Sequence, residues 1–469
     1  MWLKTIRTAF SGGTRLWFML ALVFTFGALY KGEPHGGYED LRDYFADAER
    51  LWLQFDLRIS DAPEAKYSRY PLGLAILSGP GVYAGEAIEY LTGGHVGRRA
   101  VMGLIVPLAA VLASMLIYEI ALMISASERV ALWSGVVFSL GSPLLTYGRL
   151  FYTDVLVLFF VLLTAWAWLR YTETGLVYWL WVGGGALAGT FVCHYATILL
   201  VGGLWLAFAL SVVRSSNPAR WRGVAALSLA LSVAVGGLLC LNAYRHGNPF
   251  RSGYDYGYAE ERLPMFVLSS VPISLAALGR VFWRVPWMLP ALCFVPRLFR
   301  VNRTLAWGVC LAFGMQATFW LTFPEYIRFY LRYALPLMAL LALALPLIPM
   351  SAARKGGPTG SRMLLYSGLV LIMWNIGFFL SGDDVFPSFF LDPRESNPLP
   401  RCHVWYMEPL PPDSRLWGSV MGPVQYAVLS GFGLAAAVSL GLAVRSAVRT
   451  DAAGGTLQRV QADSIEAHA

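Results

Sequence analysis

Acidic side chains gather in one short stretch of the chain, GGYEDLRDYFADAERLW, at residues 36–52. Asp40, Asp43 and Asp47 are spaced i, i+3 and i+7, which places them on one face of a helix. Tyr44 shares that face. Carboxylates grouped in this way can act as a general base or can simply solvate the helix, and the spacing leaves both interpretations open.

The other side of this predicted helix is apolar. Leu41, Phe45, Ala48 and Trp52 fall on it, and we expect this side to face a membrane. An amphipathic helix with such a division lies in the plane of the membrane surface. A carboxylate held near the headgroups is partly desolvated, which suits a general base.

The elements around this stretch are predicted to be membrane spans. Of the 469 residues 57% are hydrophobic and 14% are charged, whereas soluble domains carry about 25% charged residues. The apolar residues form blocks of roughly 18–25, the length of a helix that crosses a bilayer. The two-residue alternation of an outer-membrane barrel does not occur in these blocks. We therefore expect an all-α polytopic membrane protein.

About twelve transmembrane helices are predicted. They lie at residues 14–31, 99–123, 130–147, 154–171, 177–193, 196–213, 223–241, 281–296, 304–322, 333–350, 363–380 and 420–444. Residues 71–91 are apolar but broken by prolines and glycines, and residues 264–278 are similar. Such breaks indicate re-entrant or interfacial elements rather than full spans.

Basic residues indicate how the spans are oriented. They form five clusters next to predicted spans: Lys4, Arg7 and Arg15; Arg214, Arg220 and Arg222; Arg297, Arg300 and Arg303; Arg354, Lys355 and Arg362; and Arg445 and Arg449. With twelve spans all five clusters fall on one side, which the positive-inside rule makes cytoplasmic. Both termini are then cytoplasmic, and we expect a multi-pass protein of the inner (cytoplasmic) membrane.

The longer loops fall on the other, outer side. They are residues 32–98, 148–153, 242–280, 323–332 and 381–419. We expect one membrane domain over residues 1–449 and a polar cytoplasmic tail at residues 450–469. The net charge of +8 is spread over short loops, which argues against a nucleic acid partner. The spacing of the five cysteines fits neither a disulfide framework nor a metal site.

The acidic stretch resembles the first periplasmic loop of the C-type glycosyltransferase fold. More narrowly, it is similar to the protein O-mannosyltransferase and lipid A aminoarabinose transferase superfamily. Members carry an Asp-Glu pair after the first span, with a Tyr four and an Ala eight residues past the Asp. Asp40, Tyr44 and Ala48 keep that spacing, but Leu41 replaces the Glu, and Glu39 precedes the Asp. The departure leaves Asp40 or Asp43 as the catalytic acid, and Asp40 is favoured.

A second motif is SPLLTYGRLFYTDVLVLFF at residues 142–160. The family has a short second outer loop that ends in an acid opening the fourth span, and Asp154 matches it. The alternative is that Thr153 or Asp154 only caps the helix. An acid that enters a bilayer is costly and tends to be functional, which favours the resemblance.

Three further motifs follow in the order that the family has. NAYRHGNPFRSGYDYGY at residues 242–258 is similar to a stretch after the seventh span, with His246 where an aromatic residue is usual. LGRVFWRVP at residues 278–286 resembles a Gly-Arg element before a Pro. Arg332-Tyr333 before Pro336 resembles an Arg-Tyr-x-x-Pro start of a late span. All five motifs fall on the predicted outer side.

The resemblance implies both an activity and a donor. It implies a glycosyltransferase that moves a sugar from a polyprenyl monophosphate, such as undecaprenyl phosphate, to an acceptor hydroxyl on a glycan, a lipid or a protein. Asp40 would take the proton of that hydroxyl as its oxygen attacks the anomeric carbon, so that the transfer inverts that carbon in one step. Asp154 would orient the acceptor, assist the base or hold a divalent cation.

The phosphate leaving group gains charge as the glycosidic bond breaks, so the site needs cations. Outer-side candidates are Lys66, Arg69, Arg280, Arg284, Arg328 and Arg332, of which we take Lys66, Arg69, Arg280 and Arg332 as phosphate ligands. For each one the alternative is that it snorkels to anionic headgroups. Contacts to substrate are expected from Tyr44, Tyr67, Tyr70, His246 and Tyr254.

A metal ion is an open alternative. Mg²⁺ or Mn²⁺ held by Asp40 and Asp154 would suit their oxygen ligands. The histidines are scattered, and no ligand spacing recurs among them.

Two other function classes are weighed against the transferase. A transporter or lipid flippase predicts ionisable residues in the middle of spans, where this chain carries little charge apart from Glu119. A polysaccharide ligase or polymerase would use a large late loop, and residues 381–419 keep that alternative open.

Overall fold

The computed structural model describes residues 13–30, 39–57, 71–94, 97–148, 151–215, 218–250, 284–322, 334–351 and 366–376, and single helical positions between 271 and 282 and between 435 and 445. The regular structure within these ranges is helical, with no strand among the described residues. The prediction of an all-α protein is confirmed for this part of the chain.

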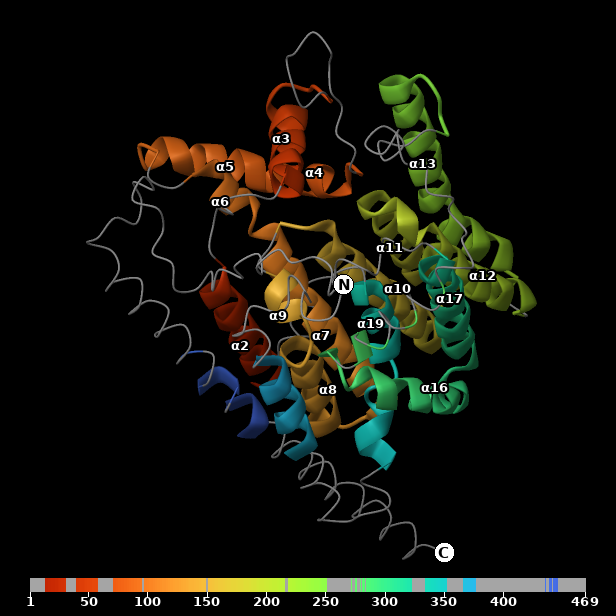
Figure 1. The fold of residues 1–469 in the computed structure, drawn as a ribbon. Helices are drawn as coiled ribbons and strands as arrows, with labels where there is room; N and C mark the ends of the chain where they lie inside the picture. The colour runs from red at the N-terminus through yellow and green to blue at the C-terminus, as the bar shows by residue number, and fades with distance from the viewer. Residues whose placement is uncertain are drawn as a thin grey trace, which may run out of the picture.

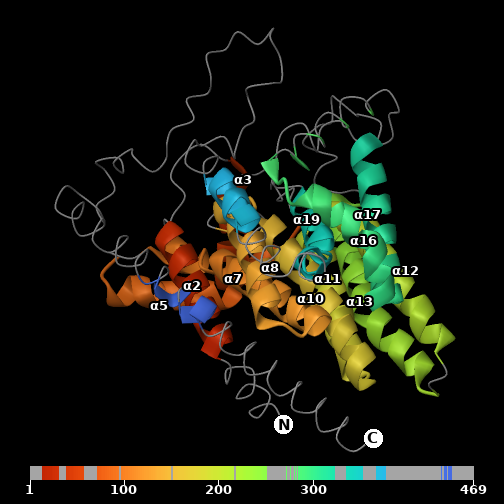
Figure 2. The ribbon, with the colours of Figure 1, turned by 90° about the horizontal axis from the view of Figure 1, so that it is seen from below.

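The helices follow the predicted spans closely. In chain order they are α2 (Gly13–Leu29), α3 (Glu39–Leu53), α4 (Gly73–Leu77), α5 (Gly79–Leu91), α6 (Arg98–Met102), α7 (Ile105–Ser125), α8 (Glu128–Leu140), α9 (Leu144–Tyr147), α10 (Thr153–Thr174), α11 (Tyr178–Cys193), the 3-10 turn η1 (Tyr195–Thr197), α12 (Ile198–Arg214), α13 (Arg220–His246), α16 (Met288–Val301), α17 (Arg303–Thr322) and α19 (Leu335–Ala342). In both ribbon views α10, α11, α12 and α13 lie side by side (Figures 1 and 2).

Five helices of the described chain are long and apolar enough to cross a membrane. They are Arg98–Ser125, Thr153–Thr174, Tyr195–Arg214, Arg220–His246 and Arg303–Leu321. Shorter apolar helices occupy four more of the predicted spans, at Gly13–Gly27, Tyr178–Cys193, Leu335–Ser351 and Tyr366–Ile376. The number of twelve spans is not confirmed. The predicted spans 130–147 and 281–296 correspond to α8 and α16, which have 13 and 14 residues and are not among these helices, and residues 420–444 lie largely outside the described residues.

One predicted span begins later than expected. The prediction placed it at residues 281–296, whereas α16 occupies Met288–Val301. The Val285 N–H donates to the Val281 carbonyl at 2.8 Å, which completes one helical turn before Pro286. Proline has no N–H with which to continue a helix, which explains the break between that turn and α16.

The flank of the helix bundle is apolar, as lipid contact requires. On α7 the exposed residues Leu104, Leu108 and Leu112 repeat every four positions and so form one stripe along the helix. Their side chains are 47%, 56% and 41% exposed. A continuous exposed apolar stripe would be a liability in water, but it is the normal surface of a membrane-spanning helix.

Helix ends meet in two separate layers, and one layer contains the predicted outer loops. The Trp287 indole N–H donates to the Gly141 carbonyl at 2.9 Å, which joins the start of α16 to the end of α8. The Asn375 amide donates to the carbonyls of Leu140 and Ser142 at 2.7 and 2.8 Å. These contacts bring together helix ends that the sequence predicted to lie on the outer side.

The opposite layer contains the basic loops. Arg15 at the start of α2 forms an ion pair with Glu119 of α7 at 3.0 Å. The hydroxyls of Ser211 and Thr304 are hydrogen-bonded at 3.0 Å, which joins the end of α12 to the start of α17. Successive helices therefore run in opposite directions between the two layers, as the predicted topology requires for the described spans.

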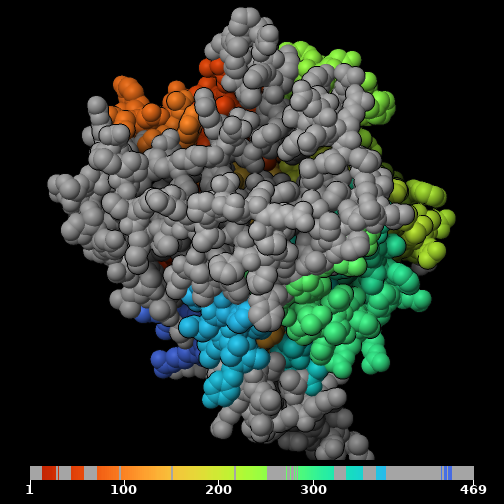
Figure 3. Space-filling view, in the orientation of Figure 1, coloured from red at the N-terminus to blue at the C-terminus, as the bar shows by residue number. Residues whose placement is uncertain are grey.

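The first outer loop folds into helices that gather at one end of the bundle. Figure 1 shows α3, α4 and α5 there, with α5 lying across the end. Figure 3 shows the same side at the surface, with α5 and the tip of α13 at that end and α16 toward the other. Helices in this loop were predicted, and the break at residues 71–91 corresponds to the boundary between α4 and α5.

The described residues on the apolar face of α3 pack on protein, whereas the prediction was that this face contacts a membrane. Phe45 and Ala48 are buried inside the protein. The Trp52 indole N–H donates to the Ala75 carbonyl of α4 at 2.8 Å. Burial against protein is the better solution for this face because α4 and the residues before α10 provide packed apolar partners on that side.

Small residues let neighbouring helices approach closely. A Cβ added to Gly203 of α12 would lie 2.6 Å from the Ala312 backbone nitrogen of α17. A Cβ on Gly184 of α11 would lie 2.6 Å from the Ala226 carbonyl oxygen of α13. Association of helices in lipid depends on such backbone packing, since lipid provides no hydrophobic drive between spans.

Replacing Gly203 by Ala should destabilise the bundle. The added methyl group forces α12 away from α17, which we expect to cost about 1–3 kcal/mol. The measurement is thermal unfolding of the purified protein in detergent.

The matched control is Gly202→Ala on the same helix. A Cβ at Gly202 meets only the end of Met315, at 3.9 Å, so this variant should melt at or above the wild-type temperature. Equal melting temperatures for the two variants would contradict the close approach of α12 and α17.

Candidate functional site

Asp154 lies in the first turn of α10 and is 4% exposed. The N-cap of α10 is Tyr152, whose side chain makes no capping hydrogen bond. The alternative in which Thr153 or Asp154 serves as the N-cap is therefore wrong. A carboxylate in the first turn of a helix interacts favourably with the helix dipole.

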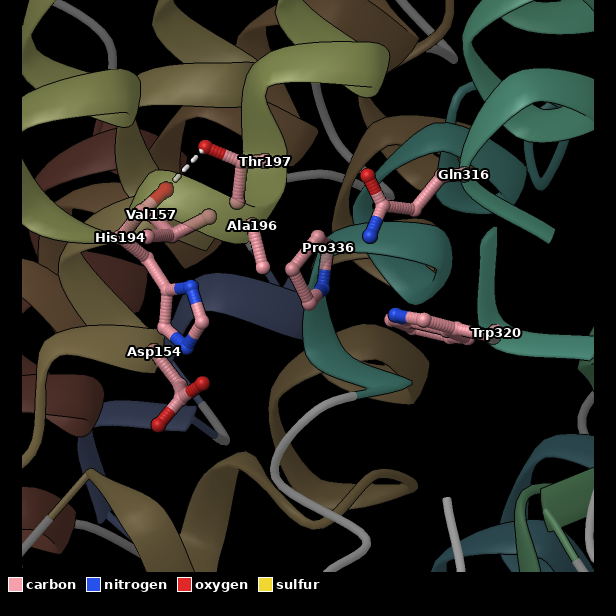
Figure 4. Close-up of a pocket in the computed structure, with 8 residues that line it drawn as sticks. All are labelled: Asp154, Val157, His194, Ala196, Thr197, Gln316, Trp320 and Pro336. Atoms are coloured by element: carbon pink, nitrogen blue, oxygen red, sulfur yellow. Dashed lines mark hydrogen bonds between the residues drawn. The ribbon is translucent and has the colours of Figure 1, made fainter. Parts of the chain in front are cut away.

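Asp154 opens onto a pocket at the outer end of the bundle. The pocket has about 250 Å³ of empty space, including the part open to solvent. Its lining residues come from α10, the turn before α12, α17 and α19: Asp154, Val157, His194, Ala196, Thr197, Gln316, Trp320 and Pro336 (Figure 4).

His194 stands beside Asp154 where the chain leaves α11. Its backbone is extended, at φ −155° and ψ 109°, so the helix ends at this residue. The His194 carbonyl accepts hydrogen bonds from the Thr197 N–H at 3.0 Å and from the Thr197 hydroxyl at 2.6 Å. This turn directs the imidazole toward the Asp154 carboxylate, as Figure 4 shows.

Helix α3 packs on the two residues that lead into α10. The rings of Phe45 and Phe151 are stacked, with centroids 4.3 Å apart and planes 6° apart. The rings of Tyr44 and Tyr152 meet edge to face at 6.5 Å. Tyr44 lies one turn after Asp40, so the backbone positions of the two predicted acids lie at the same end of the bundle.

A second group of polar side chains joins α3, η1 and α13. Asp47 and Arg245 are both buried, and both act electrostatically on the Tyr195 hydroxyl. Arg245 also donates to the Leu57 carbonyl at 3.4 Å. Arg245 was not predicted as a site residue, although it lies inside the third motif. The feature of the sequence that could have singled out Arg245 is its position as a basic residue two places before Gly-Asn-Pro, on the predicted outer side.

Two acids of the first outer loop, Asp47 and Glu49, do more than solvate a helix. Asp47 is buried, and Glu49 accepts two hydrogen bonds from the Arg99 guanidinium, at 3.2 and 3.1 Å. Arg99 also lies over the Phe45 ring, 5.6 Å from its centroid. Glu49 therefore holds α3 against α6, which is a structural role.

The predicted site residues are only partly described by the structure. Asp154 and Tyr44 are both buried, and Tyr44 packs on Tyr152 at the start of the helix that carries Asp154. His246 is half-buried in the last turn of α13 and does not line the pocket. Asp40 and Asp43 belong to α3, but their side chains lie outside the described residues. The other predicted site residues lie outside them altogether: Lys66, Tyr67, Arg69, Tyr70, Tyr254, Arg280 and Arg332.

The described part of the chain contains no group of three His, Cys, Asp or Glu side chains that could hold a metal ion. A site made from Asp40 and Asp154 depends on a side chain outside that part, so Mg²⁺ or Mn²⁺ stays a prediction. Four of the five cysteines are described, and all four are free thiols.

Comparison with known proteins supports the resemblance found in the motifs. Residues 91–237, less than a third of the chain, match the family model described as dolichyl-phosphate-mannose-protein mannosyltransferase. The matched range contains Asp154 and His194 but not Asp40. No curated protein shows a significant sequence match to the chain.

Solved structures of ArnT from Cupriavidus metallidurans share the fold. The apo structure is 14% identical, with a TM-score of 0.55, and the match covers 92% of this chain and 75% of ArnT. The structure bound to undecaprenyl phosphate is 15% identical, with a TM-score of 0.51, and the match covers 94% and 79%. The predicted resemblance to C-type glycosyltransferases is confirmed, and so is the fold that it implied.

Removing the Phe45 ring should loosen the first outer loop from the bundle. Phe45 is 2% exposed and stacked on Phe151, so Phe45→Ala is expected to cost about 3–5 kcal/mol. Thermal unfolding in detergent and limited proteolysis of the loop measure the effect.

Phe55→Ala is the matched control, because Phe55 follows the same helix and is 83% exposed. It should leave both readouts unchanged. If Phe45→Ala also melts like wild type, α3 is not held on Phe151.

Proposed function

We propose that this protein is a membrane glycosyltransferase that moves a sugar from a polyprenyl-monophosphate donor to an acceptor hydroxyl at the extracytoplasmic face. The observation that carries the proposal is the position of Asp154. It is a buried acid in the first turn of a spanning helix, and it lines a pocket. The helix that carries Asp40 packs on the residues just before it.

The lipid donor is supported by the location of the pocket. The pocket lies at one end of a bundle with an apolar flank, so a substrate with an isoprenoid tail in the bilayer can present its head group there. The matching family model is named for a dolichyl-phosphate-mannose donor, and one ArnT structure is bound to undecaprenyl phosphate. Both names describe a sugar or phosphate on a polyprenyl chain.

The proposed reaction is a single displacement. Asp40 takes the proton of the acceptor hydroxyl while that oxygen attacks the anomeric carbon from the face opposite the phosphate. The bond between the anomeric carbon and the phosphate oxygen breaks, and the phosphate leaves with the electron pair. The anomeric carbon is inverted, and no covalent enzyme intermediate forms.

Asp154 has a separate role in this proposal. It accepts a hydrogen bond from the acceptor or from the base and so fixes the direction of attack. His194 lies beside its carboxylate and limits the orientations that Asp154 can take (Figure 4). Lys66, Arg69, Arg280 and Arg332 would bind the departing phosphate, as cations must where negative charge develops.

The transporter alternative loses its main support. Glu119 was the clearest charged residue within a predicted span, and it forms an ion pair with Arg15 at 3.0 Å. A paired acid at the basic end of the bundle has a structural explanation and does not indicate an ion or substrate pathway. The ligase or polymerase alternative depends on residues 381–419, which lie outside the described residues.

Neutralising the proposed acids should abolish transfer without unfolding the protein. We expect Asp40→Asn to reduce the rate by about 100-fold or more, the usual contribution of a general base, and Asp154→Asn to reduce it strongly. The assay incubates purified protein with a panel of undecaprenyl-phosphate sugars and measures release of undecaprenyl phosphate and labelling of acceptor.

Asp56→Asn is the matched control, since Asp56 is an acid of the same loop that pairs with Arg50 at 3.7 Å. It should retain activity. Asp43→Asn decides between the two candidate bases. If Asp154→Asn transfers sugar at nearly the wild-type rate, the role of Asp154 on which the proposal depends is refuted. If the wild-type protein turns over no donor, the reaction class is refuted.

A further inference from the structure

The wall of the pocket opposite Asp154 carries a polar group that the fold does not satisfy. Gln316 and Trp320 lie four residues apart on α17 and so share one face of that helix. Gln316 is 1% exposed, and its side-chain oxygen has no hydrogen-bond partner among the described residues. Figure 4 shows its amide group directed toward the space between Thr197, Pro336 and Trp320.

An amide in this position is unfavourable for folding alone. Burying a carbonyl oxygen without a donor loses the hydrogen bonds that it made to water. A side chain of similar length without polar atoms, such as Met, would fill the same space at lower cost. The unsatisfied oxygen of Gln316 is therefore an acceptor available to a ligand in the pocket.

The chemistry of the lining decides what kind of ligand fits. Polar groups stand on two sides, with Asp154 and His194 on one side and Gln316 on the other (Figure 4). Pro336 lies between them, and Trp320 adds a flat apolar surface on the side of Gln316. A ring with hydroxyls around its edge and C–H groups on its faces matches this arrangement, since such pockets combine apolar walls with a few oriented polar groups.

Two other ligands fit less well. A phosphate group would meet the Asp154 carboxylate, and the described residues of the lining include no Lys or Arg. An isoprenoid segment would leave the buried Gln316 oxygen without a hydrogen-bond donor. The lining therefore favours a neutral hydroxylated group over both the phosphate and the tail of a lipid donor.

We propose that this pocket binds a sugar ring, that Gln316 accepts a hydrogen bond from one of its hydroxyls, and that Trp320 covers one face of the ring. Gln316 is then a residue that determines which sugar is accepted. The inference rests on the proposed function and deepens it, since it assigns sugar selection to α17. The ring belongs either to the donor or to a glycan acceptor, and the binding experiment separates these sources.

The test replaces Gln316 by Met. Because the Gln316 oxygen has no partner in the described fold, Gln316→Met should melt at or above the wild-type temperature. Transfer of the preferred sugar should fall about tenfold in kcat/KM, the value of one hydrogen bond. Wild type should discriminate against the analogue that lacks one particular hydroxyl, and Gln316→Met should lose that discrimination while it keeps the others.

Two arms identify the source of the ring. If the pocket holds the donor sugar, Gln316→Met weakens binding of the undecaprenyl-phosphate sugar without acceptor but leaves binding of undecaprenyl phosphate unchanged. If it holds an acceptor sugar, donor binding is unchanged and the KM for the acceptor rises. Trp320→Leu should weaken binding of the same substrate as Gln316→Met does. Thr318→Ala, at an exposed position of α17, should leave binding of both substrates unchanged.

The inference and the proposed function fail in distinguishable ways. If no donor is turned over by wild type, the proposed function is refuted. If wild type transfers sugar but Gln316→Met retains wild-type KM values, donor binding and deoxy-sugar discrimination, only the assignment of this pocket is overturned. A Gln316→Met protein that melts well below wild type would also overturn it, because Gln316 would then have a structural role.

Discussion

The site depends on one packing interaction, the stack of Phe45 on Phe151. These residues belong to the first and second outer loops, which about a hundred positions of sequence separate. The stack fixes α3 beside the residues that lead into α10, so that acids from two loops lie at one end of the bundle. Glu49 strengthens the same attachment by pairing with Arg99, which itself lies over the Phe45 ring. Without these contacts nothing in the described structure would hold the helix of Asp40 beside the start of the helix of Asp154.

The bundle beneath provides a rigid base for this arrangement. Glycines such as Gly203 bring helix backbones into direct contact, and ion pairs such as Arg15 with Glu119 satisfy charges at the opposite end. Stability and chemistry are thus separated along the axis of the bundle. Paired and apolar groups hold the spans together, whereas the pocket is lined by polar residues that include Gln316, whose side-chain oxygen the described fold does not satisfy. Such a division is expected where a binding site must keep groups available for its ligand.

The membrane explains why so few polar groups are enough. Hydrogen bonds and charges act more strongly between buried groups than in water, so one buried carboxylate and one amide can orient a hydroxylated substrate. The same burial makes each polar residue in the pocket costly. A residue such as His194, at the break between α11 and η1, is then better explained by its position beside Asp154 than by packing.

The sequence by itself determined the helices, the alternation of the described spans and the resemblance to C-type glycosyltransferases, because apolar length, basic loops and short motifs are local properties. It also singled out Asp154. It assigned the wrong environment to the apolar face of α3, since periodicity shows that a face is apolar but not whether lipid or protein covers it. It did not find the roles of His194, Arg245 and Gln316. Each of these is an isolated polar residue in the sequence, and only the packing of α17, η1 and α13 around the outer end of the bundle brings them close to the acids.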